Sequence, residues 1–262
     1  MKNAVVLVGG LGKRLHPITL DLIPKPLVQV QGKTLLDHIL MNFVHYGVDR
    51  IALSACHHSN LIREYILATQ WGNQAEIIVV MEKRPLGTAG AIRHAVQTAG
   101  IDDCFYLING DTLTNVNLQS MRLFYRTLPT DNTLMALAPS SNLQNRVVTV
   151  NNQYRILDTV LYPSSQDLEN RLRHQESYLV NAGLYIMPIA ALQHIPVNVA
   201  TPINTLITEL VNQGTLYAFP SGAQYFNVGT AHELHLAEQS WRPDQQSHFL
   251  PIHGIESKMS SD

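Results

Sequence analysis

The feature that most constrains the fold is a short apolar run followed directly by a glycine-rich loop near the start of the chain. Residues 4–8 are apolar and rich in valine, and Gly9, Gly10 and Gly12 follow at once. An apolar run bounded by glycines is typical of a buried strand in a parallel sheet. A strand that opens into such a loop is where α/β proteins bind phosphate, because bare backbone N–H groups can approach the oxygens closely. The segment therefore predicts an α/β protein with an anion site after its first strand.

Three cationic side chains surround this loop. Lys13 and Arg14 follow the glycines, and Lys25 lies between two prolines. Arginine can hold a phosphate through two parallel hydrogen bonds, and lysine acts as a mobile point charge. The glycines alone would suit any strand–turn–helix junction, so the cations are what favour a phosphate site.

The loop matches neither of the two common glycine-rich fingerprints. A P-loop needs four residues between its glycines and then Gly-Lys-Ser/Thr, and the loop at residues 9–15 does not have this pattern. A dinucleotide fingerprint needs a third glycine where Leu15 stands, and an acidic residue that does not follow the second predicted strand at Ala55. A dinucleotide-dependent oxidoreductase is therefore disfavoured.

The pattern of apolar residues divides the chain into two halves. The first half alternates predicted strands and helices, at 35–47, 51–55, 60–71, 76–81, 88–98 and 104–108. This alternation predicts a doubly wound sheet. From about residue 134 short strands dominate, with predicted elements at 134–138, 146–150, 155–161, 178–187, 203–212, 216–219 and 231–241. The second half predicts a mixed or antiparallel extension of the sheet, or a lid-like subdomain.

Composition excludes several classes of function. A net charge of −2 argues against a nucleic-acid groove, which normally needs a basic excess. Cys56 and Cys104 lie in or beside apolar runs, as reduced thiols of cytoplasmic proteins do. The sequence contains neither a signal peptide pattern nor an apolar segment long enough to span a membrane. We expect a cytoplasmic protein that binds neither nucleic acid nor membranes.

The end of the chain is polar. From Arg242 onward the composition predicts a mobile tail. Residues 249–252 are apolar within it, and they would either dock on a partner chain or remain untethered.

Asp111 is the best candidate for a metal ligand. It comes just after the fourth predicted strand, at the edge where ligands collect in open α/β sheets. A carboxylate there suits Mg²⁺, which keeps one or two protein carboxylates, several waters and substrate phosphates. A plain Asn-Gly-Asp turn without a metal is the alternative.

Other chemistry is weakly indicated. Residues 86–90 form a second glycine-rich junction, where the backbone of Gly87 could read the edge of a base. The twelve histidines predict no metal site, because the side chains of adjacent residues such as His57 and His58 should diverge. The absence of a Gly-x-Ser-x-Gly elbow gives no support to covalent catalysis.

Taken together and in order, these motifs resemble the signature of the sugar-1-phosphate nucleotidyltransferases, nearest to the guanylyltransferases for mannose or manno-heptose 1-phosphate. The resemblance extends over roughly residues 3–240. It rests on residues 9–15 with Pro17, 24–27, 32–33, Glu82 with 85–91, 109–112, 181–185 and 228–230.

The resemblance implies an architecture and a reaction. The fold would be α/β, a three-layer, Rossmann-like, doubly wound mixed sheet with a small antiparallel sugar-binding extension. A single domain would cover residues 1–241, with a nucleotide-binding half at about 1–133, a sugar-binding half at about 134–241, and a tail at 242–262. In the implied reaction, an oxygen of the sugar phosphate attacks the α-phosphorus of an NTP in line, giving NDP-sugar and pyrophosphate.

The resemblance also implies roles for individual residues. The catalytic residues would be Arg14, Lys25 and Asp111. The nucleotide-binding residues would be Gly9, Gly10, Gly12, Lys13, Arg14, Glu82, Gly87 and Thr88. The sugar would contact Asn109, Asn181 and Gly183. The cofactor would be Mg²⁺, held by Asp111 and Asn227.

Three positions depart from the family pattern. Asn227 stands where the family has a second metal-binding aspartate, residues 161–163 lack the Glu and Lys of a Glu-Lys-Pro motif, and no glutamate occurs early in the helix at Ile203. Two hypotheses follow. One is an active enzyme that uses GTP and a mannose-type or manno-heptose-type 1-phosphate. The other is a catalytically impaired paralog that binds nucleotide or NDP-sugar and acts as a regulatory subunit. For either hypothesis, the expected protein partners are further copies of the same chain or an active paralog.

Overall fold

The first strand of the computed structural model is buried on both faces. The structure describes residues 1–10, 12–140, 147–160, 178–245 and 247–251, with residues 13, 140, 147, 160 and 178 described by their backbone only. In β1 (Asn3–Leu7), Ala4 and Val6 join one buried cluster and Val5 joins another. Successive side chains of a strand point to opposite faces, so this apolar run requires cover on both sides. The predicted buried strand is confirmed.

The strands of the described residues form one nine-stranded sheet and two small two-stranded sheets. In the large sheet β1 pairs in parallel with β4 and β6, and β4 with β5. On the other side β6 pairs antiparallel with β11, β11 with β8, and β8 in parallel with β12. The bounds are β4 (Arg50–Ala55), β5 (Glu76–Met81), β6 (Phe105–Asn109), β8 (Thr133–Ser140), β11 (Tyr178–Met187) and β12 (Leu216–Pro220). The predicted mixed α/β sheet is confirmed.

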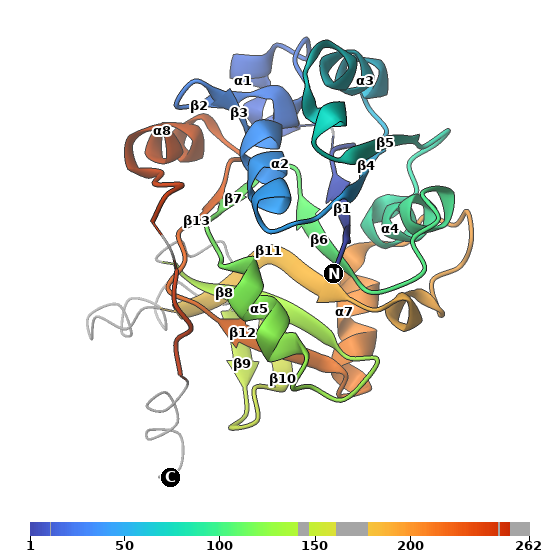
Figure 1. Ribbon diagram of the computed structural model, residues 1–262, viewed down its shortest axis with the longest axis vertical. Helices are drawn as coiled ribbons and strands as arrows, with labels where there is room; N and C mark the ends of the chain where they lie inside the picture. The colour runs from blue at the N-terminus through green and yellow to red at the C-terminus, as the bar shows by residue number, and fades with distance from the viewer. Residues whose placement is uncertain (11, 141–146, 161–177, 246, 252–262) are drawn as a thin grey trace.

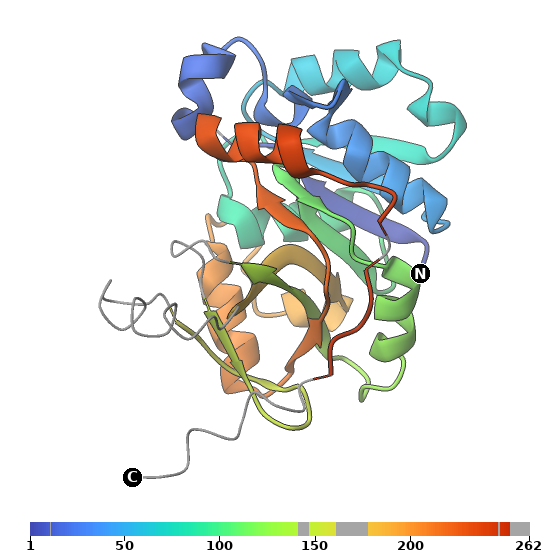
Figure 2. The same ribbon diagram turned by 90° about the vertical axis from the view of Figure 1, so that its left-hand side faces the viewer.

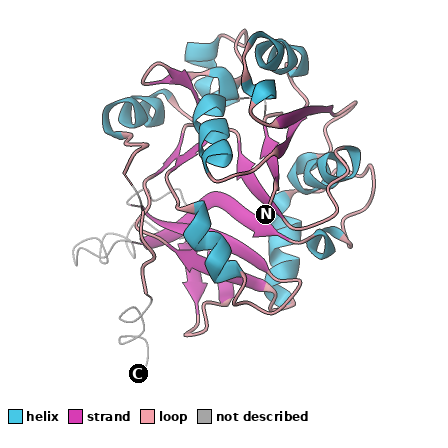
Figure 3. Cartoon of the chain, in the orientation of Figure 1, coloured by secondary structure: helices cyan, strands magenta, loops and turns pink. Residues whose placement is uncertain are grey.

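Helices cover both faces of this sheet (Figures 1 and 3). Figure 2 shows α5 and α7 on opposite sides of the strands. One face carries α2 (Leu35–His45), α3 (Ser59–Ala68) and α5 (Leu118–Tyr125), and the other carries α4 (Gly87–Thr98) and α7 (Ile203–Asn212). The three layers are those expected from the alternating first half. Among the described residues, no helix has the length and apolar character needed to cross a membrane.

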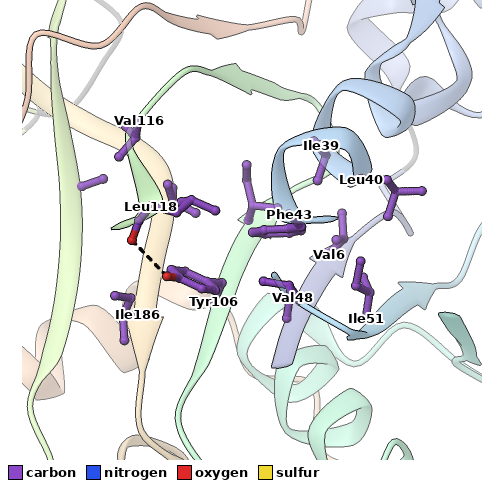
Figure 4. Packing of buried hydrophobic residues seen from close by; sticks show 14 of the residues in the cluster. Val6, Ile39, Leu40, Phe43, Val48, Ile51, Tyr106, Val116, Leu118 and Ile186 are labelled. Carbon is purple, nitrogen blue, oxygen red and sulfur yellow. Dashed lines mark hydrogen bonds between the residues drawn. The ribbon is translucent and has the colours of Figure 1, made fainter. Parts of the chain in front are cut away.

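The core between α2 and the sheet contains a buried polar group with a partner. The rings of Phe43 and Tyr106 have centroids 5.8 Å apart, and both residues are almost completely buried (Figure 4). The Tyr106 hydroxyl donates a hydrogen bond to the Leu118 carbonyl oxygen over 3.1 Å. This bond supplies the partner that a phenol needs in an apolar core, and it ties α5 to the central strand.

The second half adds the predicted antiparallel extension. Strands β9 (Val147–Val150) and β10 (Ile156–Val160) form an antiparallel pair, which joins β11 through Val180 and Val147. The departure at residues 161–163 lies outside the described residues.

Short strands, helices and 3₁₀ turns complete the described part of the chain. Strand β13 (Tyr225–Asn227) pairs antiparallel with β7 (Thr112–Thr114), so the last strand returns to the segment that follows β6. The remaining elements are β2 (Gln29–Val30), β3 (Lys33–Thr34), α1 (His16–Thr19), α8 (Ala231–Ser240), and the 3₁₀ turns η1 (Lys13–Leu15), η2 (Lys25–Leu27), η3 (Trp71–Asn73) and η4 (Ile189–Leu192).

The chain after α8 differs from the predicted mobile tail. Residues 242–245 and 247–251 lie along the domain (Figure 1). The Phe249 ring packs against Phe124, Tyr154 and Phe219, with centroids 5.4, 5.6 and 5.4 Å away. The Leu250 N–H donates to the Pro220 carbonyl over 3.0 Å. One aromatic side chain therefore anchors a segment whose overall composition is polar.

Phe249→Ala is expected to destabilise the domain by about 1–3 kcal/mol, because truncating a partly buried aromatic ring removes contacts with three other rings. Urea unfolding followed by circular dichroism measures the change. Gln245→Ala is the matched control, since Gln245 is exposed and its backbone makes hydrogen bonds with Arg242 and Asn115 that the substitution retains. Equal stability of the two variants would contradict the anchoring role.

Candidate functional site

A cavity of about 470 Å³ lies at the carboxyl ends of β1, β4 and β6. This is the edge at which open α/β sheets bind ligands. Most of the residues predicted for the site line the cavity, namely Gly9, Gly10, Lys25, Glu82, Gly87, Thr88, Asn109, Asp111 and Asn227. Gly12, Arg14, Asn181 and Gly183 are not among the lining residues, and the Lys13 side chain lies outside the described structure.

The glycine-rich loop forms one wall of the cavity. A Cβ on Gly9 would lie 2.7 Å from the Cys56 backbone nitrogen, so only glycine fits between the ends of β1 and β4. A Cβ on Gly10 would meet nothing within 4 Å, and Gly10 lines the cavity. The two glycines therefore have different structural roles. Gly9 permits β1 and β4 to pack closely, and Gly10 leaves its backbone accessible to a ligand.

An ion pair joins two separate segments inside the cavity. Lys25 Nζ and Asp111 Oδ2 are 2.5 Å apart, with side chains 10% and 28% exposed. Lys25 comes from the Pro-Lys-Pro turn, and Asp111 follows β6. Because a poorly hydrated ammonium group is stabilised by a nearby carboxylate, each residue holds the other at the cavity.

Asn227 lies beside Asp111 because of strand pairing. β13 places Asn227 opposite Thr112 of β7, and the Val228 N–H donates to the Asp111 carbonyl over 2.9 Å. Both side chains line the same cavity. The structure therefore brings together a carboxylate and an amide carbonyl from distant parts of the sequence.

Glu82 shapes the turn that leads into α4. Its Oε2 accepts a hydrogen bond from the Leu86 backbone N–H over 3.0 Å, and its Oε1 accepts one from the Ser54 hydroxyl over 3.3 Å. Both carboxylate oxygens thus have partners within the protein. The family resemblance implied that Glu82 binds the nucleotide, and the structure adds a role in ordering residues 82–86.

The nearby thiol is not activated for nucleophilic attack. Burial first, and the negative charge of Glu82 second, raise the pKa of Cys56 above its ordinary value. A thiol with a raised pKa forms little thiolate at neutral pH. Cys56 lines the cavity without the electrostatic surroundings of a catalytic cysteine.

Gly87 begins α4 in contact with the second half of the chain. Its φ is +63°, and a Cβ there would lie 2.6 Å from the Thr201 carbonyl oxygen. Thr201 also accepts a hydrogen bond from the Ala89 N–H over 2.9 Å and donates one to the Leu86 carbonyl over 2.8 Å. The junction that sequence analysis connected with base recognition is therefore also a close backbone contact.

Arg14 is exposed and lies near Gly229, outside the cavity lining. A Cβ on Gly229 would be 3.0 Å from both Arg14 Nη2 and Glu233 Oε2. Glu233 accepts hydrogen bonds from the Gly229 N–H and the Thr230 hydroxyl, and its own N–H donates to Thr230. Glu233 was not singled out from the sequence, although Thr230-x-x-Glu233 has the residue pattern of a helix N-cap; here its carboxylate bonds the Gly229 N–H, one residue before the N-cap.

Asn181 and Gly183 form a bulge in β11 next to the cavity. Asn181 Oδ1 accepts the Gly183 N–H over 2.8 Å, and its Nδ2 donates to the Tyr185 hydroxyl over 2.5 Å. The register against β8 shifts between Asn181 and Tyr185. A Cβ on Gly183 would be 3.1 Å from Asn109 Nδ2, and Asn109 lines the cavity. The bulge therefore lies against the Asn109 side chain.

His57 and His58 do not diverge as the sequence predicted. Their ring centroids are 3.9 Å apart, and both rings approach Asp21. The cause is the left-handed backbone of His58, with φ of +53°, which turns its side chain toward that of His57. His57 lines the cavity and was not among the predicted site residues.

The chain is similar to known proteins over most of its length. The chain matches the family model described as nucleotidyl transferase over residues 3–242. A D-glycero-alpha-D-manno-heptose 1-phosphate guanylyltransferase from Aneurinibacillus thermoaerophilus is 28% identical over 90% of this chain and 97% of its own length. A mannose-1-phosphate guanyltransferase from Neurospora crassa is 26% identical over 87% of this chain and 60% of its own length.

A solved structure shows the same fold. HddC from Yersinia pseudotuberculosis, complexed with GMP-PN, superposes with a TM-score of 0.73, covering 91% of this chain and 99% of its own, at 22% sequence identity. The chain spans about 60% of the length of the mannose-1-phosphate guanyltransferases that it matches.

Proposed function

Because the chain belongs to the nucleotidyl transferase family, whose model covers residues 3–242, we propose that it joins an NTP to a sugar 1-phosphate and releases pyrophosphate. The observation that carries this proposal is the cavity where the open glycine loop, Lys25 and Asp111 meet at the carboxyl edge of the sheet. A triphosphate needs cations and bare backbone N–H groups, and this cavity offers both.

The chemistry we propose needs no nucleophilic side chain. An oxygen of the sugar phosphate attacks the α-phosphorus, the bond to the β-phosphate oxygen breaks, and pyrophosphate leaves. The Gly10 backbone would bind the phosphates, Lys25 would neutralise charge at the reacting phosphorus, and Arg14 would face the β- and γ-phosphates. Such a reaction is accelerated by positioning and charge neutralisation.

Mg²⁺ is the proposed cofactor, and the donor set fits it. Asp111 and Asn227 supply a carboxylate and a carbonyl oxygen at one cavity, and Mg²⁺ prefers such hard oxygen ligands together with substrate phosphates. When bound there, the ion would neutralise phosphate charge. Asn227 contributes no formal charge, so the ion would be held less tightly than by two carboxylates.

We favour GTP and a mannose-type or manno-heptose-type sugar 1-phosphate. The support is the guanylyltransferase relatives, of which the heptose enzyme matches this chain over nearly its whole length. Asn109, with Asn181 and Gly183 behind it, would face the sugar.

A second candidate function rests on Asn227. If the missing charge abolishes turnover, the chain would bind nucleotide or NDP-sugar without consuming it and act as a regulatory subunit, as a homo-oligomer or with an active paralog. A relative from Danio rerio, 27% identical, is called mannose-1-phosphate guanylyltransferase catalytic subunit beta, and a protein named as a catalytic subunit implies a partner subunit with another role.

Pyrophosphate release tests both functions. The protein is incubated with Mg²⁺, each NTP in turn and a panel of sugar 1-phosphates. Release with GTP and a mannose-type or heptose-type phosphate is the expected result. Binding of a nucleotide without release from any pair would favour the regulatory alternative, and absence of both binding and release would contradict the family function.

Asn227→Asp is expected to lower the Mg²⁺ concentration needed for half-maximal pyrophosphate release by about tenfold, because a second carboxylate adds attraction worth about 1–4 kcal/mol at contact distance. A Mg²⁺ titration of the initial rate measures this. Asn152→Asp adds the same charge at an exposed turn residue and should leave the titration unchanged. Identical curves for Asn227→Asp and the wild type would show that Asn227 is not at the ion.

A further inference from the structure

We infer that Asp21, His57 and His58 form a binding site for a transition-metal dication of the Zn²⁺ class, separate from the position proposed for Mg²⁺. One ligand atom from each residue lies within 4.8 Å of the other two. The three residues come from two turns, one after α1 and one after β4. The inference is independent of the reaction proposed above.

The separations between the Asp21 carboxylate oxygen and the two histidine nitrogens are those found around a single ion. His57 Nε2 and His58 Nε2 lie 3.0 and 3.4 Å from the same oxygen, Asp21 Oδ1. Zinc holds imidazole nitrogen and carboxylate oxygen at about 2.0–2.2 Å, so two ligands in a tetrahedral site stand about 3.3–3.5 Å apart. Little movement of these side chains is needed to accept an ion between them.

The donor set selects the class of metal. Two imidazoles and one carboxylate suit Zn²⁺, Co²⁺, Ni²⁺ and Cu²⁺, whereas Mg²⁺ prefers oxygen ligands throughout. Three protein ligands leave a fourth position for water. The Asp21 side chain is 54% exposed and the two histidines are 32% and 24% exposed, so an ion can enter from solvent.

The backbone aims these side chains at a common point. Asp21 and His58 both have left-handed φ values, +57° and +53°, and Leu20 before them has +48°. Residues other than glycine occupy this region at a cost in free energy, although Asp and His tolerate it better than most. Without the left-handed turn at His58, the two adjacent rings would point apart.

A bound ion would brace the wall of the cavity. His57 lines the cavity, and Asp21 lies shortly before the Pro-Lys-Pro turn that carries Lys25. An ion held by both turns would fix the segment that leads to Lys25 against the end of β4. The structural consequence is a cavity wall that is stiffer with the metal than without it.

Isothermal titration with ZnCl₂ tests the site, using the full chain without a histidine tag and in excess Mg²⁺. We expect the wild type to bind one Zn²⁺ per chain. His58→Asn and Asp21→Asn should each bind Zn²⁺ with a dissociation constant at least about tenfold higher. Asparagine tolerates left-handed backbone, so both variants should fold, as circular dichroism would check. His232→Asn, which removes an exposed histidine of α8, should bind Zn²⁺ as the wild type does.

Absorption spectra of the Co²⁺-loaded wild type give a second measurement that needs no variant. Visible d–d bands of a four-coordinate nitrogen–oxygen site are expected, and they should disappear when Zn²⁺ displaces Co²⁺. Lack of saturable Zn²⁺ binding, or equal affinity in His58→Asn and the wild type, would overturn the inference. Pyrophosphate release with Mg²⁺ is assayed separately, so failure here leaves the proposed reaction intact.

Discussion

Asp111→Asn is expected to lower the rate of pyrophosphate release by about 100-fold or more. The substitution keeps the size of the side chain and removes its charge, so both the proposed Mg²⁺ and the Lys25 ammonium lose their carboxylate partner. The residual rate should respond only weakly to added Mg²⁺. Initial rates over a Mg²⁺ titration measure both effects.

The exposed ion pair between Lys2 and Asp49 offers a matched control. Its atoms are 2.7 Å apart, and its side chains are 67% and 56% exposed. Asp49→Asn should change the rate by less than about twofold, because an ion pair in solvent contributes little. A rate for Asp111→Asn within twofold of the wild-type rate would contradict the proposed role of Asp111 in the reaction.

Gly87→Ala is expected to cost about 2–5 kcal/mol of folding free energy. A left-handed backbone costs alanine about 1–2 kcal/mol, and overlap with a rigid backbone adds about 1–3 kcal/mol. The Cβ would lie 2.6, 2.8 and 3.0 Å from the carbonyl oxygen, carbon and nitrogen of Thr201, none of which can rotate away. Urea unfolding measures the loss, and nucleotide affinity should fall as the mouth of the cavity shifts.

Gly100→Ala separates backbone strain from overlap. Gly100 has φ of +62°, close to the +63° of Gly87, and a Cβ there would meet nothing within 4 Å. We expect Gly100→Ala to lose only about 1–2 kcal/mol and to keep nucleotide affinity. An equal loss of unfolding free energy in Gly87→Ala and Gly100→Ala would show that the backbone at Thr201 moves to accommodate the added Cβ at little cost.

The elements around the cavity could be predicted because they follow from local rules. The apolar run of β1 needs cover on both faces, and the structure supplies it through Ala4, Val5 and Val6. Asp111 comes two residues after the end of β6, at the edge where open α/β sheets bind ligands, and the structure places it in the cavity. What each of these residues binds remains a prediction.

The features that could not be predicted depend on a single backbone angle or on a distant contact. One left-handed φ at His58 reverses the expectation that adjacent histidines diverge. Phe249 packs into an aromatic cluster whose other members, Phe124, Tyr154 and Phe219, come from three separate earlier parts of the chain. The hydrogen bonds of Glu82 depend on where Leu86 and Ser54 lie in space. Composition and spacing carry none of this information.

The order of strands in the sheet has a consequence for synthesis of the chain. β1 is made first, yet one of its two neighbours, β6, ends only at Asn109, and the antiparallel partner that covers β6, β11, ends at Met187. A nascent chain therefore carries an open, apolar sheet edge while the ribosome completes the intervening residues. Open edges of this kind pair with other chains. The strands of the first half of the chain therefore remain exposed to self-association until β11 has been made.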